Sequence, residues 1–176
     1  MSSRKNLYRM VLSAMFLALA MVLPLFIGQI PQIGQALSPM HIPVLLCGFF
    51  CGPWYGLVVG FIAPILRFFL FGMPPLMPGG IAMAFELATY GFLSGLLYKL
   101  LPKKIPYIYV SLIGAMLAGR VVWGVVRAVI AGVTNAQFGM EAFLAGAFIN
   151  AVPGIILHIV LIPAIVIALR KYTAKE

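Results

Sequence analysis

Six apolar stretches, separated by short connections, account for most of the chain. A helix that spans a bilayer needs about 20 predominantly apolar residues, and five of the six stretches are close to or above that length. The second is shorter and rich in glycine. The stretches cover residues 7–30, 41–51, 54–72, 81–101, 107–133 and 142–169. The pattern therefore predicts an all-α, polytopic membrane protein with six transmembrane helices.

The connections contain residues that end helices. Gly52 and Pro53 form a tight turn between the second and third stretches, and the loop 73–80 holds three prolines, which are incompatible with a regular helix. Little chain is left for a soluble domain, so residues 1–176 are expected to form a single six-helix domain. The first stretch also has features of a secretory signal peptide. Its apolar run continues to Ile30, which favours a retained first helix.

Charge fixes the expected orientation. Nine of the twelve Lys and Arg residues form three clusters: Arg4, Lys5 and Arg9; Lys99, Lys103 and Lys104; Arg170, Lys171 and Lys175. Lys and Arg concentrate in cytoplasmic connections of membrane proteins, so both termini and the fourth connection are expected in the cytoplasm. The net charge of +9 follows this membrane pattern and is not evidence of nucleic-acid binding.

The other three arginines, Arg67, Arg120 and Arg127, lie within apolar stretches. A guanidinium at membrane depth is costly, and by default it marks a site or a buried pair. Counting about 1.5 Å per residue from the expected span ends places polar residues of four helices in the outer half of the membrane. These residues are Arg67, Glu86, Arg120 and Asn150, with Arg127 two turns above Arg120. The sequence predicts a polar cavity that opens outward.

Charge balance indicates what the cavity binds. Glu86 is the only acidic residue in the six stretches. It is expected to pair with an arginine, and whether that partner is Arg67 stays open. Two positive charges then remain, and an anion such as a carboxylate or phosphate would balance them through the bidentate guanidinium. Alternatively, the arginines are structural, and Trp123 and Tyr90 stack on an aromatic ligand.

Other polar residues are weaker candidates. His158 is expected near the cytoplasmic end of the sixth span, as a packing or interfacial residue. His41 either gates the cavity or caps a helix. Cys47 and Cys51 lack further ligands for a metal, and no cofactor is expected. There are no catalytic motifs and no nucleotide-binding segment, so the chain is not expected to be an enzyme or to hydrolyse ATP itself.

Small residues recur at four-residue spacing, which lets helices approach closely in lipid. The pairs are Ala14 and Ala18; Gly48, Gly52, Gly56 and Gly60; Gly91 and Gly95; Ala142 and Gly146. Most are expected to pack within the chain.

The pair in Ala14-Met15-Phe16-Leu17-Ala18 carries a family resemblance. Together with size and topology, it resembles the substrate-binding (S) components of energy-coupling factor (ECF) vitamin transporters of bacteria and archaea. Residues 38–46, 56–67 and 83–91 resemble the subgroup of pantothenate and pyridoxine or hydroxymethylpyrimidine carriers.

The resemblance implies a location and a division of labour. The chain would sit in a prokaryotic plasma membrane and bind a vitamin with high affinity in an outward pocket, closed by the loops 31–40 and 73–80. Ala14 and Ala18 would dock on a transmembrane coupling subunit, and two ATPase subunits would drive uptake. The uncompensated charge favours pantothenate, with pyridoxine or hydroxymethylpyrimidine as the alternative. A stand-alone channel or exporter is the rival from another class.

Overall fold

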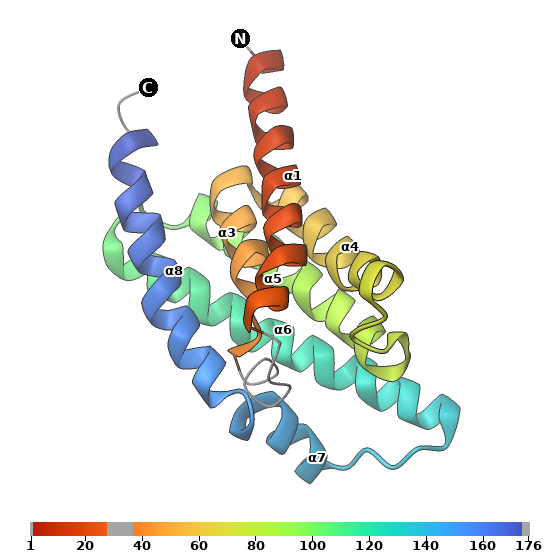
Figure 1. Ribbon diagram of the computed structural model, residues 1–176. Coiled ribbons are helices and arrows are strands. Elements are labelled where there is room, and N and C mark those ends of the chain that lie inside the picture. The colour runs from red at the N-terminus through yellow and green to blue at the C-terminus, as the bar shows by residue number, and fades with distance from the viewer. Residues whose placement is uncertain (1, 28–36, 174–176) are drawn as a thin grey trace.

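Residues 2–27 and 37–173 are described by the computed structural model, with side chains for 4–26 and 37–169 (Figure 1). The described residues fold into helices joined by short connections, which confirms the all-α class. The helices are α1 (Ser2–Ile27), α3 (His41–Cys51), α4 (Pro53–Phe71), α5 (Ile81–Leu100), α6 (Ile105–Thr134), α7 (Met140–Leu144) and α8 (Val152–Thr173). Two π-helical turns, η1 (Leu76–Gly80) and η2 (Ala145–Ile149), precede α5 and α8.

The helices correspond to the six predicted spans. In the described residues, five helical stretches are long and apolar enough to cross a membrane, and α3 is a shorter apolar helix whose bounds match the prediction for the second span. The start of α1 and the end of α8 lie at the same end of the molecule (Figure 1), as an even number of crossings requires. The chain is a polytopic membrane protein, and the charge bias predicts that this end faces the cytoplasm.

The sixth span differs from the continuous helix expected over 142–169. It is divided into α7, the turn η2 and α8, with a break at Asn150 and Ala151. Pro153 lies in the first turn of α8, a position that suits proline because the N–H it lacks would have no partner within the helix. A continuous helix through Pro153 would lose that hydrogen bond, which favours a restart at Val152. The preference is not absolute, since Pro24, Pro64 and Pro163 lie inside helices.

Helix α5 lies at the centre and packs against α3, α4 and α6. Its close approach to α4 depends on glycines, because a Cβ at Gly91 would meet the Gly56 carbonyl oxygen and one at Gly60 would meet the Leu87 carbonyl oxygen. Helix α3 also approaches α5 closely, because a Cβ at Gly48 would meet the Ser94 hydroxyl oxygen and the Gly91 carbonyl oxygen. The recurring glycines of these helices therefore pack within the chain, as the sequence predicts.

We expect Gly91→Ala to lower the stability of the detergent-solubilised chain by about 1–3 kcal/mol, the usual cost of overpacking. The added methyl group would overlap backbone that is unable to move as a flexible side chain does. Gly132→Ala in α6 is the matched control, since a Cβ there meets no atom within 4 Å. Thermal unfolding measures both variants, and equal midpoints would contradict the close α4–α5 contact.

Candidate polar site at the centre of the helices

The Glu86 carboxylate of α5 is the centre of a buried polar cluster. Its Oε1 atom lies 2.9 Å from Nη1 of Arg120 on α6 and accepts a hydrogen bond of 2.9 Å from the Tyr90 hydroxyl. Tyr90 follows Glu86 by one helical turn, so both side chains share a face of α5. Glu86 is only 1% exposed. The sequence left its partner open, and the structure identifies Arg120 and not Arg67.

Two histidines extend this cluster. His41, the first residue of α3, places its Nε2 atom 3.8 Å from Glu86 Oε1, and its ring lies 5.4 Å from the Tyr90 ring. The His158 ring of α8 stacks on His41, with 5.9 Å between centroids and an interplanar angle of 19°. Both are buried. We refer to Glu86, Tyr90, Arg120, His41 and His158 as the Glu86 cluster.

The expected placement of His158, remote from the polar level, is wrong. Because α8 restarts at Val152, His158 lies only six residues along this helix, or about 9 Å at 1.5 Å per residue. His158 also lies within hydrogen-bonding reach of the Ser38 backbone, in the segment just before α3. An ionisable residue inside an apolar span is by default a candidate for function, and that rule was the available sequence signal for both histidines.

Several nitrogen atoms in the cluster are buried and have no hydrogen-bond partner among the described residues. They are Nδ1 and Nε2 of His41, Nε2 of His158 and Nε of Arg120. Most buried polar atoms in proteins are hydrogen-bonded, so exceptions need an explanation. Four such atoms around one carboxylate form a set of donors and acceptors suited to a small polar ligand.

Arg67 does not join the Glu86 cluster. Its Nη1 atom donates a 2.8 Å hydrogen bond to the Met21 carbonyl oxygen of α1, and its guanidinium lies 5.1 Å from the centroid of the Phe71 ring. This arginine therefore connects α4 to α1. With a backbone carbonyl as its partner, the positive charge of Arg67 is not balanced by an acidic group in the part of the chain that the structure describes.

Arg127 belongs to a second, aromatic cluster. It lies seven residues beyond Arg120 on α6, about 10 Å along the helix. Its guanidinium is 5.8 Å from the Trp123 ring and 5.3 Å from the Phe138 ring, and its buried Nε has no described hydrogen-bond partner. Phe143 stacks on Trp123 at 6.4 Å. Asn150 is in neither cluster, because it lies exposed in the break before α8.

The three arginines do not line one cavity in the described part of the structure. At the level of Arg127, a cavity of about 380 Å³ lies between residues 121–128 of α6 and residues 138–143, and apolar side chains and glycines line it. A cavity of about 150 Å³ between α6 and α8 reaches Arg120 and is otherwise lined by apolar residues such as Met116, Phe148 and Ile155. The expected outer loop 31–40 lies mostly outside the described residues. The second expected loop contains η1, which packs against α4, α5 and α6. Glu86, Tyr90, Arg120, His41 and His158 are all buried among the described residues, so the Glu86 cluster is enclosed there.

Six apolar helices around an enclosed polar cluster define a polytopic membrane protein with a polar centre. Residues 8–169 match the family described as ECF transporter, substrate-specific component, and the chain belongs to this family. No match was found among curated proteins or among solved structures. The chain is therefore a multi-pass S component of a prokaryotic plasma membrane, a transporter subunit and not an enzyme. The family implies a transmembrane coupling component and ATPases as partners. The alternative of a stand-alone channel or exporter is therefore rejected.

We expect Arg120→Met and Glu86→Gln each to destabilise the chain. Breaking a buried ion pair from one side leaves an uncompensated group and costs about 3–5 kcal/mol. The double variant removes both charges, so its loss of stability should be clearly smaller than the sum of the two single losses. Chemical unfolding of the three variants and the wild type measures this coupling. Additive losses would contradict a direct Glu86–Arg120 interaction.

Proposed function

We propose that this S component binds pantothenate, with the vitamin's carboxylate at Arg127 and its polar groups at the Glu86 cluster. The observation that carries the proposal is Arg127, a half-buried arginine beside Trp123 whose buried Nε has no described hydrogen-bond partner. A guanidinium fork is suited to a carboxylate.

Charge balance supports an anionic ligand. Of the three arginines in the spans, Arg120 alone has an acidic partner in the described part of the chain. Arg67 contacts a carbonyl and Phe71, and Arg127 contacts aromatic rings. These contacts leave two positive charges, and only Arg127 combines such a charge with an unpaired nitrogen. Arg120 lies about 10 Å from Arg127 along α6. Together with His41 and His158, it offers nitrogens without a described hydrogen-bond partner, where the hydroxyl and amide groups of the vitamin would bind.

The second candidate substrate is pyridoxine or hydroxymethylpyrimidine. The stacked His41 and His158 rings, with Tyr90 edge-on to His41, support it. Such a group of rings is suited to a neutral heteroaromatic ring, because aromatic pairs favour stacked and edge-to-face arrangements. In that case Arg127 has a structural role, and its replacement leaves ligand affinity unchanged.

We expect calorimetric titration of the purified chain to show tight binding of pantothenate. Arg127→Gln should weaken this binding by about 2–5 kcal/mol, the range for removing one partner of a desolvated charge pair. Arg4→Gln, in the exposed start of α1, is the charge-matched control and should bind as the wild type does. Binding of pyridoxine or hydroxymethylpyrimidine without a response to pantothenate would overturn the substrate assignment and leave the family unaffected.

We also propose that α1 docks on the coupling component through Ala14 and Ala18. Both residues are exposed, whereas Phe16, Ala20 and Met21 on the other side of α1 are buried in the core. Small side chains on a lipid-facing surface permit close helix approach. The exposed side of α1 continues with Val11 and Val22, so the small pair has apolar flanks for a partner helix.

We expect Ala14→Trp combined with Ala18→Trp to prevent co-purification with the coupling component and ATPases and to abolish uptake. Vitamin binding by the isolated chain should persist, because neither alanine touches the Glu86 cluster. Ala164 and Ala168 of α8 provide a matched control, since they have the same spacing and are also exposed. The corresponding double Trp variant should assemble normally. An intact complex with the α1 variant would refute the docking role.

A further inference from the structure

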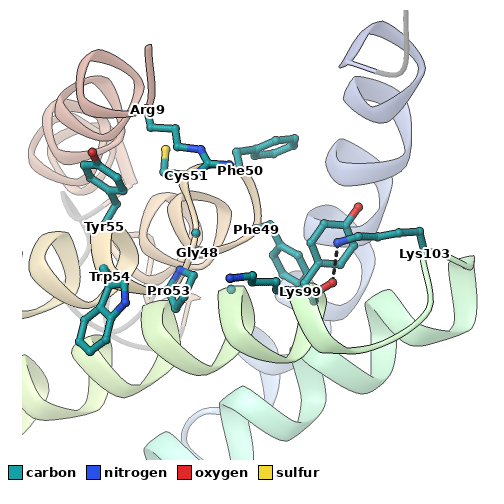
Figure 2. Close-up of a pocket in the computed structure, with 13 residues that line it drawn as sticks. Arg9, Gly48, Phe49, Phe50, Cys51, Pro53, Trp54, Tyr55, Lys99 and Lys103 are labelled. Atoms are coloured by element: carbon teal, nitrogen blue, oxygen red, sulfur yellow. Dashed lines mark hydrogen bonds between the residues drawn. The ribbon is translucent and has the colours of Figure 1, made fainter. Parts of the chain in front are cut away.

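Another cavity, remote from the Glu86 cluster, lies at the end of the molecule that holds the start of α1 and the end of α5. Its volume is about 350 Å³, and Figure 2 shows the residues that line it. Arg9 comes from α1, Lys99 from α5, and Lys103 from the connection between α5 and α6. Two segments distant in sequence, the start of α1 and the end of α5 with the connection after it, thus bring cationic side chains to one cavity. None of the described residues that line it is acidic.

Two of these three cations have no anionic partner in the described part of the protein. Lys103 donates a 2.6 Å hydrogen bond to the Tyr98 carbonyl oxygen and lies over the Tyr98 ring. Arg9 and Lys99 form no ion pair with a described residue. In Figure 2 the Arg9 side chain extends toward Phe50 and Cys51, and the Lys99 side chain extends toward Pro53. Their charges therefore converge on the cavity without neutralisation.

The start of α4 adds to the positive potential. Gly52, Pro53, Trp54 and Tyr55 line the cavity, and no side chain caps this helix. The free N–H groups of a first helical turn and the helix dipole attract anions, phosphate groups above all. The Lys99 ammonium group extends toward this helix start. An anion between the two would be attracted by both positive charges.

The walls of the cavity are suited to a lipid more than to a free ion. Phe49 and Phe50 line it, and Trp54 at its edge is 70% exposed and pairs with Phe92 at 5.4 Å. Tryptophan and tyrosine favour the headgroup level of a bilayer. Beyond Trp54, α4 exposes Val58 and Phe61, an apolar surface along which acyl chains would lie.

We infer that this cavity binds the phosphate headgroup of an anionic phospholipid of the cytoplasmic leaflet, with Arg9 and Lys99 as the main cationic contacts and the exposed side of α4 against the acyl chains. Basic pockets between transmembrane helices on the cytoplasmic side are typical of anionic-lipid sites. This site is independent of the vitamin proposal, since its residues do not belong to the Glu86 cluster.

Native mass spectrometry of the purified full chain tests this site. Phosphatidylglycerol and phosphatidylcholine with identical acyl chains are added separately, and the bound lipid is counted. We expect retention of phosphatidylglycerol over phosphatidylcholine. Arg9→Gln combined with Lys99→Gln should weaken phosphatidylglycerol binding about 25-fold, or roughly 5-fold per charge. If the double variant does not fold, as judged by circular dichroism, Lys99→Gln alone should give the 5-fold loss.

Arg4→Gln combined with Lys104→Gln is the charge-matched control. Both residues are exposed in the same basic clusters and do not line the cavity, so phosphatidylglycerol binding should stay at the wild-type level. Equal binding of the two lipids, or an equal loss in the control variant, would overturn the site. Displacement of phosphatidylglycerol by an equal concentration of inorganic phosphate would identify a free-phosphate site and overturn the lipid assignment.

Discussion

The burial of one carboxylate is the constraint on which the arrangement of the helices depends. An isolated carboxylate inside a membrane protein is strongly unfavourable unless cationic and hydrogen-bonding groups surround it. Glu86 on α5 receives them from α6 through Arg120, from its own helix through Tyr90, and from α3 through the nearby His41. His158 extends the contact to α8. One acidic residue thus sets the relative rotation of four helices, since each must turn a particular residue inward.

Close helix packing makes this arrangement possible. Gly91 lies one residue after Tyr90 and allows α5 to approach Gly56 of α4 at backbone distance. On the opposite side, a Cβ at Gly119 would meet the Tyr90 ring. The absence of a side chain at Gly119, the residue before Arg120, therefore lets the Tyr90 ring pack against α6. In lipid, where apolar surfaces gain little from contacting each other, such backbone proximity is a main source of helix association. The glycines and the polar cluster therefore depend on one another.

The molecule separates its polar regions by depth and by chemistry. The Glu86 cluster is enclosed, combines acid, base and aromatic groups, and contains unpaired nitrogens. The cavity at the basic end carries cationic side chains beside exposed aromatic residues. Helix α1 has two different sides, because the Met21 carbonyl oxygen accepts the hydrogen bond of Arg67 in the core while Ala14 and Ala18 are exposed. A partner helix at Ala14 and Ala18 would thus lie within two turns of α1 of the buried residues Phe16 and Met21.

Local features of the sequence determined the number of apolar spans, most of their bounds and the placement of both ends on one side, but not the break within the sixth span. The length of apolar runs and the position of prolines and lysines are read residue by residue, so His41–Cys51 was recognisable as a short helix. The partner of Glu86 was not recognisable from the sequence, because it depends on how α5 and α6 are rotated relative to each other. By composition alone, Arg67 was as good a candidate as Arg120. The true partner of Arg67 is the Met21 carbonyl, a group that every residue carries and no sequence pattern marks. His158 was misplaced because the break before Pro153 shortens the distance from the helix start. Only the tertiary structure decided these pairings, since they join residues far apart in the chain through geometry that apolar periodicity does not encode.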